Sequence, residues 1–101
     1  MFGCEVQPER DGVRVLPHGE LDAASGPALE RQIGELRDAG FRRLILDLSQ
    51  LEFMDSTGLR LILKWNAEAR QDGFSIVLVP GPPTVQRVFE VTGTAASLPF
   101  V

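Results

Sequence analysis

Residues 44–63 read LILDLSQLEFMDSTGLRLIL, and this stretch decides the fold. Leu44 to Leu48 is nearly all apolar, which is typical of a strand buried on both faces of a parallel or mixed sheet. A short loop follows and ends at residues 55–58, after which the apolar residues recur at helical spacing. We therefore expect a buried strand, a loop and then a helix over residues 56–72 that ends at Gly73.

The flanking segments continue this alternation of strands and helices. Apolar residues alternate with polar ones on either side of an Asp11-Gly12 turn, which predicts an N-terminal hairpin. The expected elements are strands at 2–7 and 13–17, a helix between a Ser25 N-cap and Gly40, the strand at 44–48, the helix at 56–72, a strand at 74–79, a short helix at 83–93 and a last strand at 98–101. The order ββαβαβαβ predicts an α/β fold, in which helices pack against a mixed sheet, as a single domain over residues 1–101.

The composition excludes several classes of function. Apolar residues make up 44% of the 101 residues and the formal charge is −4, so a packed core is expected and a basic nucleic-acid-binding face is not. The single cysteine, Cys4, allows no internal disulfide and indicates a reducing compartment. No signal peptide or membrane-spanning run is present, so we expect a cytoplasmic protein that binds neither membrane nor nucleic acid. The chain has no usual zinc ligand set and no phosphate-binding loop, so we expect neither a metal nor a cofactor.

The DSTG tetrapeptide at residues 55–58 places Ser56 where the second helix is expected to begin. A helix N-terminus tolerates a phosphate, because its first N–H groups are unpaired and it is the positive end of the helix dipole. Gly58 removes a side chain from the first turn, which would let another surface approach the backbone closely. These residues fit a modifiable serine on an exposed corner, and position alone also fits Asp55 or Ser56 as a simple N-cap.

Three motifs taken together resemble the STAS domain (sulfate transporter and anti-sigma factor antagonist) over nearly the whole chain. They are the strand ending in Asp47-Leu48 with the loop at 55–59, the GELD sequence at 19–22, and the segment PTVQRVFEVTG at 83–93. The resemblance implies that Ser56 is a phosphoacceptor and that Asp22 lies near its loop. Antagonists of this family usually continue into a final helix, so we expect that helix to be missing or truncated after Val101.

The resemblance also implies a mechanism. An unphosphorylated antagonist binds an anti-sigma factor, itself a serine kinase of the histidine-kinase-like ATPase class, and thereby frees a sigma factor to join RNA polymerase. Phosphorylation at Ser56 reverses this binding, and a phosphoserine phosphatase resets the switch. On this interpretation the chain is not an enzyme. Its expected partner-binding residues are Asp22, Asp55, Ser56, Thr57, Gly58, Leu59, Arg60 and Trp65.

Two of these assignments have structural alternatives. We expect Asp22 to serve recognition more than folding, the alternative being that it caps the first helix. The second helix has two apolar stripes, with Leu59, Ile62, Leu63 and Ala67 expected to face the sheet and Leu61, Trp65 and Ala69 on an adjacent face. That second stripe either packs on a neighbouring helix or leaves Trp65 partly exposed as an interface anchor flanked by Arg60 and Lys64.

Other functions stay open at this point. A non-switching STAS subunit, such as the small cytoplasmic partner of a lipid-transport ATPase, would need no modification of Ser56. A serine hydrolase built from Ser56, His18 and Asp22 is disfavoured, because the sequence has no Gly-x-Ser-x-Gly elbow and little room for a substrate pocket. An Asp-Thr-Gly loop of the aspartic-protease type is disfavoured by the helical pattern after Gly58.

Overall fold

The computed structural model describes residues 1–101, which form five strands, three α-helices and one short 3-10 helix. The elements in chain order are β1 (Gly3–Glu9), β2 (Gly12–Leu21), α1 (Gly26–Asp38), β3 (Arg43–Asp47), β4 (Leu51–Met54), α2 (Ser56–Asp72), β5 (Ser75–Val79), α3 (Pro83–Val91) and η1 (Ala95–Ser97). None of the helices combines the length and the apolar character that a membrane span requires.

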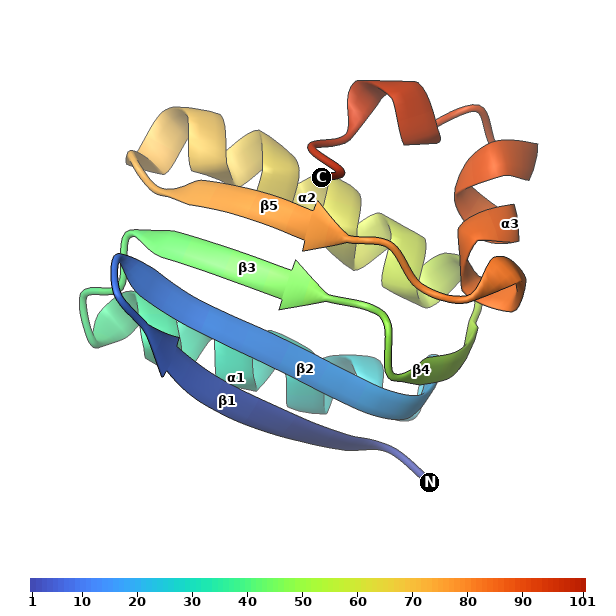
Figure 1. Ribbon diagram of the computed structural model, residues 1–101, viewed down its shortest axis with the longest axis horizontal. Helices are drawn as coiled ribbons and strands as arrows, with labels where there is room; N and C mark the ends of the chain where they lie inside the picture. The colour runs from blue at the N-terminus through green and yellow to red at the C-terminus, as the bar shows by residue number, and fades with distance from the viewer.

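The sheet is mixed, with the strand order β1-β2-β3-β5 and with β4 beside the end of β2. β1 and β2 form the expected antiparallel hairpin, while every other strand pair is parallel. Figure 1 shows α1 and α2 on one face of the sheet and α3 at the end where β4 lies. The parallel strands therefore present their carboxyl ends, and the loops that leave them, at the β4 end.

The structure confirms the expected fold class and differs from the expectation at two strands. Residues 51–54, expected as loop, form β4, a four-residue strand that pairs with β2. The expected last strand at 98–101 is reduced to a single bridge between Phe100 and Leu78 of β5. Helix α2 spans Ser56–Asp72 as expected, and Gly73 ends it in the left-handed conformation with φ 73°.

One face of α2 packs into the core, and it matches the expected face in part: Leu59 and Ile62 are buried as expected, whereas Leu63 and Ala67 are exposed. Ile62 and Trp65 are 0% and 2% exposed and belong to the main hydrophobic cluster, whereas Leu63 is 36% exposed. Of the two alternatives for Trp65, partial exposure at an interface is therefore wrong, and its assignment to the partner-binding residues is corrected. A side chain with 2% of its surface accessible offers almost no area to a partner, so its role is to fill the core.

A largely buried ion pair joins the middle of the sheet to the turn that leads into β4. Asp47, at the end of β3, accepts hydrogen bonds from Arg14 of β2 and from the backbone N–H of Ser49, each at 2.9 Å. Burial raises the pKa of Asp47, but the hydrogen bonds from Ser49 and the ion pair with Arg14 outweigh it and hold that pKa below the ordinary value. The carboxylate thus fixes where the chain turns after β3.

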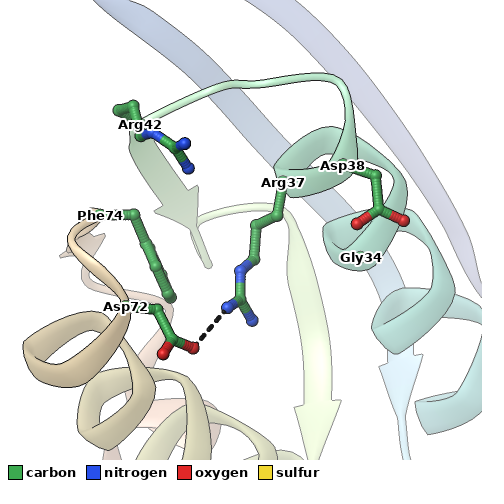
Figure 2. A pocket seen from close by; sticks show the side chains of 6 residues that line it. All are labelled: Gly34, Arg37, Asp38, Arg42, Asp72 and Phe74. Carbon is green, nitrogen blue, oxygen red and sulfur yellow. Dashed lines mark hydrogen bonds and ion pairs between the residues drawn. The ribbon is translucent and has the colours of Figure 1, made fainter.

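At the opposite end of the molecule, Arg37 joins the C-terminal halves of α1 and α2. Its guanidinium pairs with Glu68 at 2.7 Å and with Asp72 at 2.9 Å, and it lies 4.2 Å from the ring centroid of Phe74. Figure 2 shows the Arg37–Asp72 pair beside Phe74, in a pocket that Arg42 also lines. Because the pairs lock the two helices together, they set the position of α2 beside α1.

We expect Asp47→Asn to lower the free energy of unfolding by about 1.5–3 kcal/mol at neutral pH, the range for hydrogen bonds to charged groups. Folding lowers the pKa of Asp47, so the ionised carboxylate stabilises the protein at pH values above the ordinary pKa of aspartate. This stabilisation is lost as the pH falls through the pKa of the folded state. Urea unfolding of the wild type and of Asp47→Asn between pH 7 and pH 3 should show that the difference in their free energies of unfolding becomes smaller as the pH falls. The matched control is Glu9→Gln, which removes the more exposed partner of Arg14 and should cost no more than about 1 kcal/mol. Equal losses for the two variants would contradict the role given to Asp47.

Candidate functional site

The ends of β2 and β4 bring two loops together. The strands pair in parallel, with Leu21 beside Met54 and a bulge between Gly19 and Glu20. The backbone N–H of Asp55 then donates to the carbonyl of Leu21 at 3.2 Å, one residue beyond the strand. The turn after β2 and the start of α2 consequently lie side by side, as Figure 1 shows at the β4 end of the sheet.

Ser56 is the first residue of α2 and is exposed. The cap of the helix is Asp55, whose side chain accepts a hydrogen bond from the N–H of Thr57 at 2.8 Å. The Ser56 hydroxyl has no hydrogen-bond partner within the chain, so it does not cap the helix. The DSTG sequence predicts either a helix N-cap or the site of a modifiable serine. Asp55 is the N-cap, and the Ser56 hydroxyl stays available for modification.

Asp22 closes the turn that leads into α1. Its carboxylate accepts from the backbone N–H groups of Ala24 and Ser25, each at 3.1 Å, and the Ser25 hydroxyl oxygen lies at the same distance from it. The hydrogen bonds from Ser25 and Ala24 lower the pKa of Asp22, which is consistent with a carboxylate held in its charged form. Ser25 occupies the N-cap position of α1 as expected, but its hydroxyl donates to the carbonyl of Glu20 at 2.8 Å rather than capping the helix. The carboxylate of Asp22 thus has a structural task.

Gly58 is buried, and the surface that approaches it belongs to this chain. A β-carbon at position 58 would clash with Met54 and would lie 2.9 Å from a methyl group of Leu21. The glycine therefore lets the first turn of α2 settle onto the paired ends of β2 and β4. The expectation that Gly58 admits a partner surface is wrong, because its open side faces the core.

The structure divides the expected partner-binding residues into two groups. Ser56 and Arg60 are exposed, and Asp22, Asp55 and Thr57 are half-buried. Gly58, Leu59 and Trp65 are buried, so they belong to the packed side of α2 and do not form the surface of the corner.

Sequence reasoning missed one exposed aromatic residue beside the corner. Phe53 lies in β4, pairs in register with Glu20 and is 47% exposed. Phe53 and the buried Met54 point to opposite faces of β4. No signal in the sequence indicated this exposure, because residues 51–54 were expected as loop.

The structure shows no catalytic arrangement among the candidate residues. Asp22 uses its carboxylate on Ser25 and Ala24, His18 is exposed, and no hydrogen bond joins Ser56, His18 and Asp22. A triad would need the nucleophile and base within hydrogen-bond reach and the acid oriented toward the base. No three His, Cys, Asp or Glu side chains gather as metal ligands.

Comparison with known proteins points to one family. The family model described as STAS domain matches residues 6–101. BtrV of Bordetella bronchiseptica, named for a role as an anti-sigma factor antagonist, is 35% identical over 81 residues, which cover 80% of this chain and 70% of BtrV. An anti-sigma-B factor antagonist of Staphylococcus aureus is 32% identical over 75 residues, covering 74% and 69% of the two chains.

Solved structures agree with this grouping. An anti-sigma factor antagonist from Mycobacterium paratuberculosis superposes with a TM-score of 0.85 at 28% identity, over 99% of this chain and 85% of that one. The unphosphorylated form of the anti-sigma factor antagonist SpoIIAA shares the fold, with a TM-score of 0.80 at 23% identity over 98% and 86% of the chains.

We expect Gly58→Ala to destabilise the protein because its methyl group would overpack Met54 and Leu21. Gly34→Ala is the matched control, since Gly34 is also helical and a β-carbon there would meet nothing within 4 Å. Both substitutions gain helix propensity, so Gly58→Ala should be the less stable of the two by about 1–3 kcal/mol. Thermal and urea unfolding measure the difference. Equal stabilities would contradict the close packing beneath Ser56.

We expect Asp22→Ala to lower the melting temperature, because the hydrogen bonds from the backbone N–H groups of Ala24 and Ser25 to the carboxylate are lost. The lowered pKa of Asp22 means that this contribution is present at neutral pH and disappears as the pH falls through the folded value. The control is Asp38→Ala in the last turn of α1, whose carboxylate has no ion pair or hydrogen bond. Melting curves at pH 7 and pH 3 make the comparison. If Asp22→Ala melts like Asp38→Ala at neutral pH, Asp22 serves recognition alone.

Proposed function

Because this chain belongs to the STAS domain family, we propose that it is an anti-sigma factor antagonist whose partner binding is switched off by phosphorylation of Ser56. The observation that carries the proposal is the exposed Ser56 hydroxyl, which starts α2 and has no partner within the chain. The family match over residues 6–101 and the names of the relatives support the assignment.

The partner of the unphosphorylated chain is an anti-sigma factor that is also a serine kinase of the histidine-kinase-like ATPase class. Binding releases a sigma factor for transcription. The kinase then transfers the terminal phosphoryl group of ATP to the Ser56 oxygen, the hydroxyl loses its proton, and ADP leaves. A phosphoserine phosphatase hydrolyses the ester and restores the binding form. This chain supplies the acceptor serine and the docking surface, and it is not an enzyme.

The proposed docking surface surrounds Ser56. Asp55 and Asp22 contribute carboxylates at its edge, and Arg60 contributes a cation one turn further along α2. Phe53 adds an aromatic side chain that is 47% exposed. Interfaces are commonly anchored by aromatic and arginine side chains, so Phe53 and Arg60 are the expected anchors.

Two electrostatic effects oppose each other when Ser56 carries a phosphate. The group adds about −1.5 to −2 charges at neutral pH, and the N-terminus of α2 favours it by about 0.3–1 kcal/mol. A carboxylate such as Asp55 at about 6 Å repels each unit of this charge by roughly 3 kcal/mol at an effective dielectric constant near 20, before salt screening. Screening at an exposed corner reduces this repulsion strongly, so the free domain stays folded.

Docking changes the balance because a partner excludes water from the corner. The phosphate then carries charge and bulk into an interface that has less screening. The scaffold beneath Ser56 is packed and hydrogen-bonded, which makes refolding an unnecessary part of the switch. We therefore expect phosphorylation to lower partner affinity by a factor on the order of 100 or more, or about 3 kcal/mol.

The central prediction concerns substitutions at Ser56. Ser56→Ala should bind the anti-sigma factor constitutively, and Ser56→Asp should bind it poorly, because the carboxylate supplies part of the phosphate charge. Isothermal titration of the wild type, before and after phosphorylation, and of the two variants against candidate kinase-type anti-sigma factors gives the affinities. Circular dichroism on each protein gives its helix content. Equal affinities for the Ala and Asp variants, or loss of helix signal on phosphorylation, would contradict the proposed switch.

The modified residue is tested separately. Incubation with ATP and the kinase, followed by mass spectrometry, should locate the phosphate on Ser56 in the wild type and in a Thr57→Val control. The control retains the exposed acceptor and removes the neighbouring hydroxyl. Ser56→Ala that is still phosphorylated at full rate would refute Ser56 as the acceptor. A protein that no kinase modifies, but that copurifies with a transporter ATPase, would favour the non-switching STAS subunit.

A further inference from the structure

The solvent-facing side of α2 starts at Ser56 and carries unpaired cations. Ser56, Arg60, Leu63, Ala67 and Arg70 fall at helical spacing and are all exposed. These five residues form what we call the outer stripe of α2. The opposite side of the helix carries Ile62 and Trp65 into the core. The outer stripe therefore points away from the sheet along the length of the helix.

The cations of the outer stripe differ from the other cations near α2. Arg37 is held by Glu68 and Asp72, and Lys64 is held by Glu30 of α1. Arg60 and Arg70 make no ion pair and no side-chain hydrogen bond. The acidic residues of α2 are thus committed to Arg37 on α1, which leaves the two arginines of the outer stripe without a counter-charge on their own helix.

Arg60 stands at the position from which it can reach a group on Ser56. Residues at i and i+4 of a helix are surface neighbours, with β-carbons about 5–6 Å apart. Helical side chains lean toward the N-terminus, so the guanidinium of Arg60 is within reach of the turn that contains Ser56. Arginine presents a planar set of donors that matches phosphate oxygens in pairs, which makes such contacts strong and directional.

We propose that Arg60 is the internal receptor for the phosphate on Ser56, forming an ion pair within α2 that removes the arginine from the docking surface. The inference rests on the proposed function, since it takes Ser56 as the modified residue. It adds a second element to the switch. Phosphorylation introduces negative charge and, at the same time, neutralises the cation that the unphosphorylated form offers to an acidic partner surface.

The charges around Ser56 make this assignment specific to Arg60. The neighbouring elements contribute acidic residues to this end of the molecule: Glu20 of β2, Asp22 of the following turn, Glu52 of β4 and the cap Asp55. The adjacent helix α3, whose Thr84 hydroxyl donates to the carbonyl of Glu52 at 3.0 Å, carries the exposed cation Arg87. Arg70 lies fourteen residues beyond Ser56, about 21 Å along the helix, which is too far for contact.

The test is the titration of a phosphoserine installed at position 56 of the full chain by genetic code expansion. The second pKa of the phosphate, which is ordinarily about 6, is read from the phosphorus-31 chemical shift against pH. An adjacent cation favours the doubly charged phosphate and lowers this pKa. We expect the pKa to rise by about half a unit or more in Arg60→Gln, and the difference from wild type to shrink in 1 M salt, as for any exposed pair.

Three further variants complete the test. Arg60→Lys should retain part of the lowered pKa, while Arg70→Gln and Arg87→Gln should titrate like wild type. An Arg60→Gln protein that titrates like wild type, or a rise in Arg87→Gln instead, would overturn the role of Arg60. Because the phosphoserine is encoded, the result does not depend on a kinase. Failure of every kinase to modify Ser56 would count against the proposed function and would leave the titration result standing.

Discussion

The hydrogen bond from the Asp55 N–H to the Leu21 carbonyl, at 3.2 Å, joins the two segments on which the candidate site depends. It extends the parallel pairing of β2 and β4 by one step beyond the last strand residues. After this hydrogen bond the chain leaves the sheet and enters α2, so Ser56 begins a helix at the carboxyl edge of the sheet. The turn that contains Asp22 is carried to the same place by β2. A serine, two carboxylates and a helix N-terminus meet because two strand ends are paired.

Everything beneath that corner serves to hold it in place. Asp47 and Arg14 fix the turn after β3, and Gly58 lets α2 rest directly on Met54 and Leu21. Arg37 fastens the far ends of α1 and α2 to each other, as Figure 2 shows. Because these interactions hold the corner in one conformation, a switch that acts through charge at the surface is favoured over one that refolds the domain. The serine and the arginine that carry that charge are both exposed on α2, while Gly58, Ile62 and Trp65 on its other side are buried.

The sequence predicted the elements with strong patterns and missed those that depend on tertiary context. The bounds of α2 and its stop at Gly73 followed from apolar spacing and glycine conformation. β4 escaped prediction because Leu51 to Met54 are buried only at the two ends and so show no alternation typical of a strand. A bulge in β2 between Gly19 and Glu20 also shifts the register of its pairing with β4. The choice between a packed and a partly exposed Trp65 stayed open because α2 has apolar residues on adjacent faces, and only the orientation of the helix on the sheet decides which face is buried. The sequence allowed both Asp22 and Asp55 as helix caps. It could not show that Asp55 rather than Ser56 caps α2, because that depends on where the side-chain oxygen of each residue points.

The claim that the corner is preformed, and that phosphorylation changes its charge rather than its fold, is tested most directly by backbone amide NMR. Spectra of the full chain with serine and with encoded phosphoserine at position 56 should differ at residues 20–26 and 52–61, which surround the corner. Amide shifts in β3, β5 and the C-terminal half of α2 should remain unchanged. Shift changes spread through β3 and β5, or loss of the α2 amide signals, would show that the phosphate acts by refolding the domain and would contradict this account.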